Sequence, residues 1–262
     1  MSVTPESFDT VFRTANPVTS VGVSKVTVVI TCYKYGDVCL EALQSLEQQT
    51  EYPVDIVLID DCSPDDSIKK ITPWFEKNNK SEKFGKLELL RHCGNQGLSK
   101  SRNTAISRVE TPYIFILDAD NSVYPRALNV LREALENSEA AMAYSLTEVF
   151  GGKRDIVGNS VWLPEKFAFG NYIDAMAMVR TAVFQQLGGY RVMPNKFGWE
   201  DFDFWCKMVD AGLKGCHVPQ ILCRYRSHST SMVNTETRNF VQERLHSIKR
   251  DFEKHHKMTF NF

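Results

Sequence analysis

Two carboxylates stand one residue apart in Asp118-Ala119-Asp120, directly after the apolar run Tyr113–Leu117. Carboxylate oxygens are preferred ligands of Mg²⁺ and Mn²⁺, and these cations leave positions open for phosphate oxygens. A pair of carboxylates would repel a diphosphate unless a cation lay between them. The motif therefore predicts a metal–diphosphate site. Taken alone it is equally compatible with a solvated turn, because Asp and the following Asn121 favour turns.

Polar residues also follow two earlier apolar runs. Thr31-Cys32-Tyr33 follows Val26–Ile30, and Asp60-Asp61-Cys62-Ser63 follows Val54–Ile59. Ligands of an open parallel sheet bind beyond the carboxyl ends of its strands. We therefore expect these residues to line one cleft together with Asp118-Ala119-Asp120, offering an aromatic ring and several carboxylates.

Further acids and a histidine occur in the second half. Glu200 and Asp201 follow Gly198-Trp199 at the start of an expected helix, where the helix dipole alone would favour acids. His228 lies in Tyr225-Arg226-Ser227-His228, and a single histidine is more often a surface or core residue than a ligand. By themselves these residues assign no function.

The elements that would position these residues alternate between strand and helix. Ser63 and Pro64 are favourable N-cap and first-turn residues for the second helix. The strands are apolar runs rather than alternating ones, as expected when both faces of a sheet are covered. The pattern predicts an α/β fold with a mainly parallel, Rossmann-like sheet flanked by helices. The expected strands are Val26–Ile30, Val54–Ile59, Leu87–Leu90 and Tyr113–Leu117, and the helices are Asp37–Gln49, one from Ser63-Pro64, Leu98–Ser107 and Pro125–Asn137.

The second half is less regular. The expected elements are a strand at Met176–Arg180, helices at Thr181–Leu187 and Asp201–Ala211, and a strand at Leu222–Tyr225. An amphipathic terminal helix would bury Val241, Leu245, Ile248 and Phe252 on one face. Residues 1–25 are interpreted as an extension outside the main core, or as a segment packed on the domain or on a partner.

Composition and missing motifs exclude several classes of protein. A net charge of −1 gives no overall basic field for nucleic acid. The seven cysteines are scattered singly, which predicts reduced thiols in the cytoplasm rather than a zinc site. No apolar run is long enough to span a bilayer. Dinucleotide-binding glycine motifs, a P-loop and a serine nucleophile elbow are all absent from the sequence.

In their order and spacing, these motifs are similar to those of glycosyltransferase family 2, inverting enzymes with the GT-A fold. The resemblance extends from about Val26 to Met232. It is carried by Thr-Cys-Tyr-Lys-Tyr at 31–35, Ser45–Thr50, Ile59–Ser63, Asn95–Asn103, Leu117–Asp120, Leu187-Gly188-Gly189-Tyr190, Trp199-Glu200-Asp201 and Tyr225-Arg226-x-His228-x-x-Ser231. Lys34 departs from the common pattern, in which an asparagine often follows the tyrosine.

The resemblance implies a nucleotide-binding site in the first half. Thr31 and Tyr33 resemble the residues that hold the nucleobase, with the Tyr33 ring against its face. Asp61 resembles the carboxylate that accepts a hydrogen bond from a base N–H, and Asp60 is the weaker candidate of that pair. Arg102 lies in a Ser-Arg-Asn segment that lines the nucleotide pocket in similar enzymes.

The resemblance also implies a metal site and a general base. Asp118, followed by Ala119, resembles the residue that faces the ribose or the metal, and Asp120 resembles the direct ligand of Mn²⁺ or Mg²⁺. His228 matches a position that completes the metal site in some relatives. Asp201 resembles the general base, with Glu200 beside it.

The implied reaction is metal-dependent, inverting transfer of a sugar, as in hexosyltransferases, from a nucleotide diphosphate sugar to an acceptor hydroxyl. A UDP-sugar is the expected donor, and a glycan or lipid-linked acceptor in surface-glycan or polysaccharide synthesis is the expected partner. The enzyme would be cytoplasmic, or peripheral at the inner face of the membrane, where the basic stretch Lys249–Lys257 is a weak candidate for contact. Acceptor contacts are expected from Val149–Asn171 and Met193–Gly198. In the first of these loops, Trp162, Phe167 and Phe169 would form either a sugar platform or local core.

The expected organisation is an extension at 1–25, a transferase domain at 26–235 and a C-terminal helix at 236–262. Within the domain, residues 26–122 would bind the nucleotide and residues 123–235 would face the acceptor. Three alternatives remain open: a non-catalytic nucleotide-sugar or glycan-binding module, one domain of a larger polysaccharide polymerase, and a nucleotidyltransferase. The last usually has a glycine-rich loop after its first strand, and residues 31–37 contain Gly36 alone.

Overall fold

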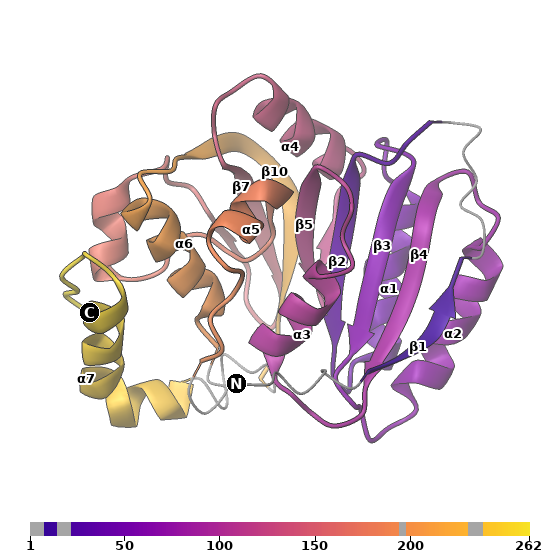
Figure 1. The fold of residues 1–262 in the computed structure, drawn as a ribbon, viewed down its shortest axis with the longest axis horizontal. Coiled ribbons are helices and arrows are strands. Elements are labelled where there is room, and N and C mark those ends of the chain that lie inside the picture. Colours follow the sequence, from indigo (N-terminus) through magenta and orange to yellow (C-terminus); the bar gives the residue numbers. More distant parts are fainter. Residues whose placement is uncertain (1–7, 15–21, 194–197, 230–237) are drawn as a thin grey trace.

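One mixed β-sheet runs through the computed structural model, which describes residues 8–14, 22–193, 198–229 and 238–262, the last range without the side chains of 238–244. In this part of the chain the sheet order is β1 (Phe8–Arg13), β4 (Phe84–His92), β3 (Val54–Asp60), β2 (Val26–Cys32), β5 (Tyr113–Asp118), β9 (Ala177–Arg180), β7 (Met142–Gly151), β10 (Gly215–Ser227) and β6 (Ser122–Val123), with β8 (Asp155–Val157) paired to β7. Figure 1 shows the strands with their broad faces visible, with α3 (Leu98–Ile106) in front of the sheet and α1 (Gly36–Glu47) behind it.

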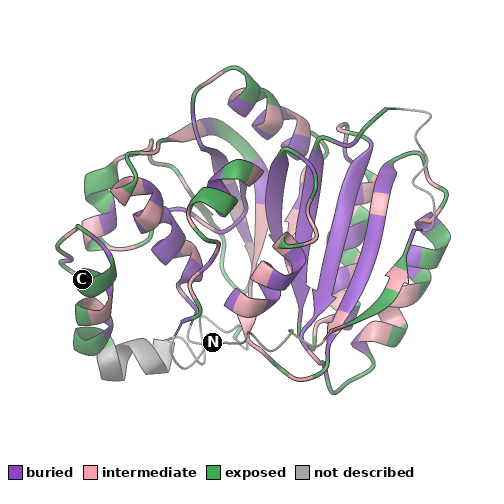
Figure 2. Cartoon of the chain, viewed as in Figure 1, coloured by how far each residue is buried: buried purple, intermediate pink, exposed green. Residues whose placement is uncertain are grey.

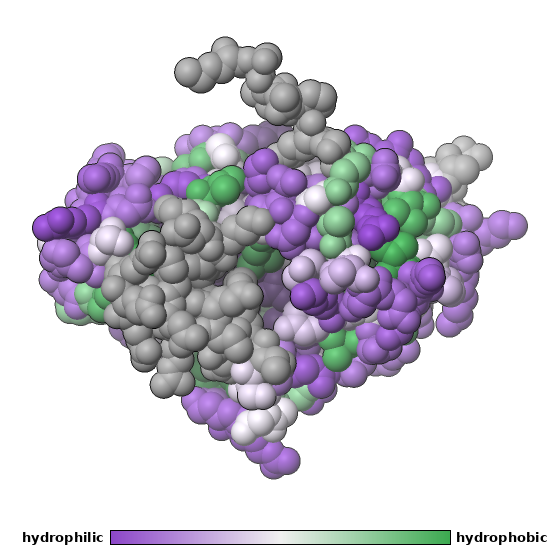
Figure 3. Space-filling model, turned by 90° about the horizontal axis from the view of Figure 1, so that it is seen from below, coloured by the Kyte–Doolittle hydropathy of each residue, from purple (hydrophilic) through white to green (hydrophobic). Residues whose placement is uncertain are grey.

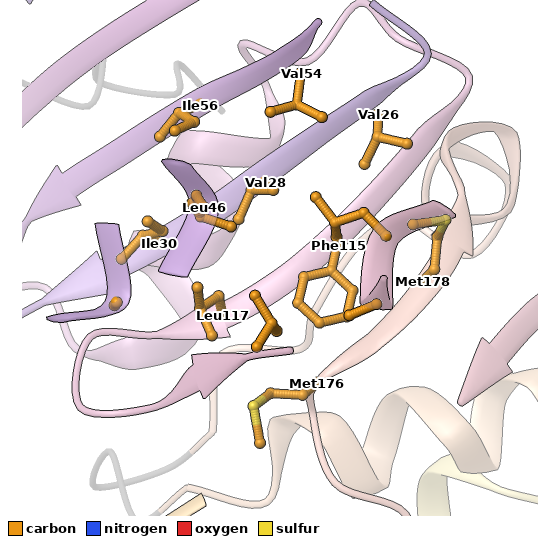
Figure 4. Packing of buried hydrophobic residues seen from close by; sticks show 14 of the residues in the cluster. Val26, Val28, Ile30, Leu46, Val54, Ile56, Phe115, Leu117, Met176 and Met178 are labelled. Atoms are coloured by element: carbon orange, nitrogen blue, oxygen red, sulfur yellow. The ribbon is translucent and has the colours of Figure 1, made fainter. Parts of the chain in front are cut away.

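The four strands predicted in the first half are confirmed, and they are parallel to one another. Every residue of β2 and β3 is buried, and Figure 2 shows the centre of the sheet buried along its length. Because both faces are covered, successive side chains enter two different cores, which is why these strands are mostly apolar and show no alternation. Figure 4 shows one of these cores, where Val28 and Ile30 lie near Leu46 and Leu117.

Helices cover both faces of the sheet (Figure 1). One core contains apolar residues of α1 (Gly36–Glu47), α2 (Ser67–Asn78) and α4 (Ala127–Glu136). The opposite core contains those of α3 (Leu98–Ile106), α5 (Thr181–Gln186), α6 (Glu200–Asp210) and α7 (Arg238–His255). The predicted α/β class with a mainly parallel sheet between helices is therefore correct.

The second helix begins later than its sequence predicts. Helix α2 starts at Ser67 rather than at Pro64, because Ser63 is held at the end of β3 and caps no helix. The backbone N–H of Ser63 donates to Asp60 Oδ2 at 2.9 Å, and its Oγ accepts from the N–H of Lys34 at 2.9 Å. The N-cap position is Asp66, and the preceding Asp65 accepts from the N–H of Ser67 through its Oδ1 at 3.1 Å.

Part of residues 1–25 packs on the domain, which was one of the alternatives for this segment. Strand β1 lies antiparallel to β4 at the edge of the sheet. Two arginines, Arg13 of β1 and Arg108, form ion pairs with the fully buried carboxylate of Glu88 in β4. The other residues of this segment that lie in 1–7 and 15–21 are outside the described range.

The second half adds strands that the sequence pattern did not indicate. Strand β7 was not predicted, and it pairs in parallel with β10 and antiparallel with β9. Strand β10 extends from Gly215 to Ser227, well beyond the expected Leu222–Tyr225. The long pairing with β7 stabilises this length and carries β10 to the sheet edge where β5 ends.

The C-terminal segment packs on α6. Phe252 of α7 is fully buried, and its ring lies 5.1 Å from that of Phe202 and 6.0 Å from that of Trp199, measured between centroids. Ile248 is buried as predicted, whereas Leu245 is 38% exposed and does not join the apolar face. The side chain of Val241 lies outside the described residues.

Phe252→Ala should destabilise the fold by about 3–5 kcal/mol, because it removes a buried ring and leaves a cavity. The cavity would lie against Trp199 and Phe202. These two residues flank Glu200 and Asp201 in the sequence. Urea unfolding followed by circular dichroism measures the change. The matched control is Leu245→Ala on the same helix, where a half-exposed side chain should cost less than about 1 kcal/mol. Equal losses in the two variants would contradict the packing described.

Among the helices in the described part of the chain, none is long and apolar enough to cross a membrane. All seven cysteines are free thiols in the structure.

Candidate functional site

The predicted polar residues meet at the carboxyl edge of the parallel strands. The sheet register aligns Thr31 with Asp118 and Cys32 with Asp60. These strand ends lie at the lower edge of the sheet in Figure 1. Figure 3 looks at this edge and shows a largely hydrophilic face, hollowed near its centre beside the segments drawn in grey. The register thus brings the three predicted motifs to one edge.

Asp61 organises the loop that leads into α3. Its carboxylate accepts hydrogen bonds from the backbone N–H groups of Gln96 and Gly97, both at 2.7 Å, and lies 2.8 Å from His92 Nδ1. Burial alone would raise the pKa of Asp61, but these hydrogen bonds outweigh it and lower the pKa. A carboxylate offers about four acceptor positions, so one remains for a ligand N–H.

The neighbouring Asp60 points into the protein instead. Its side chain is fully buried, it accepts from the N–H of Ser63, and Arg91 Nε lies 3.6 Å away. Burial raises the pKa of Asp60, and its Oδ1 has no hydrogen-bond partner in the described protein. We therefore expect Asp60 to support the loop rather than to contact a nucleobase.

Thr31 and Tyr33 differ in exposure. Thr31 is buried, whereas the Tyr33 ring is 38% exposed beyond the end of β2. Lys34 adopts a positive φ of 63° and places its ammonium 4.9 Å from the centroid of the Tyr33 ring. An exposed ring at this edge can stack on a planar ligand.

Arg102 lies between two acidic groups that are distant in sequence. Its Nη2 donates to Asp118 Oδ1 at 2.7 Å, and its Nη1 donates to Glu200 Oε1. The side chain is almost fully buried, at 1% exposure, and it lies 5.5 Å from the centroid of the Tyr190 ring. Arg102 therefore joins the end of β5 to the start of α6.

The pKa values of the acidic side chains around Arg102 are shifted by their surroundings. Burial raises the pKa of Glu200 to about 7, with Asp201 adding to the effect and Arg102 opposing it. Glu200 Oε2 is buried without a hydrogen-bond partner in the described part of the chain. Burial also raises the pKa of Asp201, again against the influence of Arg102. The sequence pattern did not single out Asp174. It is influenced by the charges of Asp118, Asp201 and Arg102, and burial raises its pKa to about 7.

Asp201 itself faces outward from the first turn of α6. Its Oδ1 accepts from the backbone N–H of Phe202 at 2.8 Å, and its Oδ2 accepts from Asn171 Nδ2 at 2.9 Å. Asn171 was expected only as the last residue of the loop Val149–Asn171. Nothing in the sequence marks it, because its contact with Asp201 spans 30 residues and depends on the tertiary fold.

Asp120 and His228 also lie together. His228 Nε2 is 3.0 Å from Asp120 Oδ2, and Arg226 Nε donates to the Asp120 carbonyl at 3.1 Å. Burial raises the pKa of Asp120, and the negative charge of Asp118 raises it further. Ser231, the last residue of the motif around His228, lies outside the described residues.

This pair fits a hard divalent cation by the chemistry of its donors. A carboxylate oxygen and an imidazole nitrogen are both ligands of Mn²⁺, and a cation would stabilise the charged form that burial disfavours in Asp120. The Asp118 carboxylate is engaged by Arg102 instead. Within the described ranges, no three acidic, histidine or cysteine side chains are gathered as a complete metal site, so phosphate oxygens or water would have to complete the coordination.

Comparison with known proteins gives a consistent result. The model of the family described as "Glycosyl transferase family 2" matches residues 27–194. The putative glycosyltransferase EpsE of Bacillus subtilis is 24% identical over 210 residues, which cover 78% of this chain and 74% of EpsE. A teichoic acid poly(glycerol phosphate) polymerase of Staphylococcus epidermidis is 28% identical over 120 residues, 46% of this chain but 16% of the polymerase.

Solved structures share the fold. TarS 1-349 of S. aureus, in complex with UDP-GlcNAc, superposes with a TM-score of 0.66 at 17% identity, covering 80% of this chain and 61% of that one. The mannosyltransferase PcManGT of Pyrobaculum calidifontis, in complex with GDP-Man and Mn²⁺, gives 0.65 at 18% identity, covering 88% and 66%. The sheet of this chain is thus arranged as in GT-A transferases.

Proposed function

The chain belongs to glycosyltransferase family 2, and from that membership we propose that it transfers a sugar from a UDP-sugar to an acceptor hydroxyl with inversion, using a divalent cation. The observation that supports this proposal most is the Arg102 bridge. It holds the Asp118 end of the nucleotide-side sheet against Glu200 and Asp201 of the opposite half. A donor bound at one side would then meet a base from the other.

The nucleotide would bind along the ends of β2, β3 and β5. The exposed Tyr33 ring would stack on the base, and Thr31 would lie beneath it. The remaining acceptor position of Asp61 would take a base N–H, while Asp60 keeps the loop in place. Arg102 is bonded on both sides by carboxylates, so we propose that it positions the acids instead of binding the nucleotide.

Asp201 would take the proton of the acceptor hydroxyl as that oxygen attacks the anomeric carbon. Its raised pKa makes it a stronger base than an ordinary aspartate, and a well-placed base contributes about 10²–10⁴-fold to a rate. The bond from the anomeric carbon to the diphosphate oxygen breaks on the opposite side, and its electron pair leaves with the nucleotide. One displacement gives inversion and needs no carboxylate nucleophile.

Glu200 would support this step from beside the base. Its pKa of about 7 leaves a substantial fraction of the carboxyl protonated near neutral pH. The unpartnered Oε2 can then donate to, or accept from, a sugar hydroxyl. A divalent cation held by Asp120 and His228 would supply Lewis-acid stabilisation of the charge that develops on the diphosphate.

The proposal is tested by release of UDP from UDP-sugars in the presence of Mn²⁺, measured without and with a sugar acceptor. An enzyme should release UDP slowly into water and faster with an acceptor. A non-catalytic binding module on the same fold would bind the nucleotide sugar and leave it intact. Binding without any turnover across a donor panel would overturn the enzymatic proposal.

Asp120→Ala should remove the metal-dependent part of donor binding. In about 1 mM Mn²⁺, we expect the affinity for UDP to fall by at least about tenfold, or ~1.4 kcal/mol. Without metal, wild type and variant should bind UDP alike. Isothermal titration calorimetry measures both conditions. Asp37→Asn, at a side chain that is 80% exposed on α1, is the matched control. If Asp120→Ala binds UDP with Mn²⁺ as tightly as wild type, the metal assignment is wrong.

The cellular role follows from the relatives by analogy. The relatives include a teichoic acid polymerase, and a related role in surface-polymer or polysaccharide synthesis is part of the proposal. We also propose that residues 26–122 bind the nucleotide and that residues 123–235 face the acceptor. A longer polymerase that contains this domain stays open, since the chain spans a small part of that relative's length.

A further inference from the structure

The loop that follows β8 delivers one polar residue directly to the proposed base. Asn171 donates from Nδ2 to Asp201 Oδ2 at 2.9 Å. This contact fixes where residues 169–171 lie, because adjacent Cα atoms are about 3.8 Å apart and two residues span at most ~7 Å. The backbone of residue 169 therefore lies within ~7 Å of the backbone of Asn171, on the segment that reaches Asp201.

Position 169 holds an exposed aromatic ring. Phe169 is 69% exposed, which makes it the most exposed aromatic side chain in the described part of the chain. Three aromatic side chains of this loop were expected to form either local core or a sugar platform. Phe167 is fully buried, and Trp162 packs against it and over Gly215, so these two belong to the core. Of these three side chains, Phe169 alone is exposed enough to contact a ligand.

The segment that presents Phe169 is held at several points. It ends the short 3-10 helix η1 (Pro164–Phe169). The Tyr172 hydroxyl accepts from the Leu163 N–H at 2.8 Å, and the Ala168 carbonyl accepts from the Asn261 N–H at 2.6 Å. Gly170, at φ 136°, turns the chain between Phe169 and Asn171, and the space beside it is open. An exposed apolar ring on a fixed segment beside open space is suited to stacking.

We propose that Phe169 and Asn171 form the acceptor subsite, and that it takes a pyranose sugar. This inference rests on the proposed function, since it assumes that Asp201 is the base. A pyranose ring has a face of C–H groups that can lie flat on an aromatic ring, while its hydroxyls point outward. Asn171 orients the base toward one of these hydroxyls. A glycerol phosphate unit has no such face.

Binding of simple pyranosides tests the subsite without turnover. Methyl β-D-glucopyranoside and methyl N-acetyl-β-D-glucosaminide are titrated into the protein with UDP and Mn²⁺, and saturation-transfer NMR reports binding. We expect both to bind wild type and Phe169→Ala to weaken them about two- to tenfold. Phe169→Tyr should retain the affinity, because it keeps the ring. Glycerol 3-phosphate, tested in parallel, should not compete.

The control is a second exposed aromatic at the opposite edge of the sheet. Tyr52 is 53% exposed and lies two residues before the amino end of β3, so Tyr52→Ala should leave pyranoside binding unchanged. In the transfer assay, Phe169→Ala should raise the acceptor KM with little change in kcat. Asn171→Ala should lower kcat for transfer, with the donor KM unchanged.

Three outcomes would overturn the inference. They are no pyranoside binding to wild type, equal binding to Phe169→Ala, and displacement of the pyranosides by glycerol 3-phosphate. Each can occur while UDP still binds and is still released from the donor, in which case the proposed function stands. Failure of wild type to bind UDP or any UDP-sugar would instead reject the proposed function.

Discussion

Asp201→Asn should reduce sugar transfer by about 10²–10⁴-fold, the usual contribution of a general base. The amide cannot take the proton of the acceptor hydroxyl, yet it has nearly the same size. Its single oxygen can keep one of the two hydrogen bonds that Asp201 accepts, from the Phe202 N–H or from Asn171. The fold and the nucleotide site should therefore persist. Initial rates of transfer and the Kd of UDP in the same buffer separate the two effects.

The control for this variant is Asp37→Asn, which changes the same functional group at an exposed position of α1. Its rate should match that of wild type. Full turnover by Asp201→Asn would remove Asp201 from the mechanism and leave Glu200 as the candidate base. A loss of UDP binding equal to the loss of rate would instead assign Asp201 to donor binding.

Arg102→Met should destabilise the protein by about 3–5 kcal/mol, since it leaves two carboxylates near the protein interior without their cation. Asp118 and Glu200 would then repel each other across the space that the guanidinium occupied. Arg102→Lys should fall between this variant and wild type, because an ammonium cannot reproduce both arms of the planar fork. Urea unfolding at fixed pH measures both variants.

The loss caused by Arg102→Met should depend on pH. Glu200 has a folded pKa of about 7, above that of an unfolded glutamate, so its ionisation opposes folding as pH rises through that range. Arg102 lowers that pKa. Without Arg102, ionisation of Glu200 opposes folding more strongly and up to a higher pH. The stability difference from wild type should therefore be greater at pH 8 than at pH 5. Arg224→Met is the control, since its ion pair with Glu148 is about one-third exposed on both sides and should be worth less than about 1 kcal/mol. A pH-independent loss for Arg102→Met would contradict the bridge.

The first half of the fold could be predicted because its signals are local. Runs such as Val26–Ile30 and Val54–Ile59 are mostly apolar without alternation, as expected for a strand covered on both faces. The start of α2 could not be predicted in the same way. Ser63 and Pro64 are good helix-start residues, but Ser63 is engaged by Asp60 and Lys34 across the fold.

Strand β7 was missed for a related reason. Its stability comes from β9 and β10, which lie far along the sequence, and its mixed composition gives no clear period of two. The sequence also could not reveal the partners of the site residues. His92, which lies against Asp61, and Asn171, which contacts Asp201, are each unremarkable in sequence and gain a role through a contact across more than 25 residues.

The residues of the site were named from family resemblance, and the fold adds how they are connected. Arg102 was expected in the nucleotide pocket, whereas it is buried between Asp118 and Glu200. Asp118 was expected to face the ribose or the metal, and its Oδ1 accepts a hydrogen bond from Arg102. We therefore propose that Asp120 and His228 carry the metal role and that Asp118 sets the geometry between the two halves.

The central claim is metal-dependent binding of a nucleotide sugar at the ends of β2, β3 and β5. Thermal unfolding of the wild-type protein across a panel of nucleotide sugars, with and without Mn²⁺, tests it most directly. At a ligand concentration of about 100 Kd, stabilisation should reach ~2.7 kcal/mol, and it should appear with a UDP-sugar only when Mn²⁺ is present. An unfolding temperature that no nucleotide sugar raises, or that rises equally without metal, would contradict the claim.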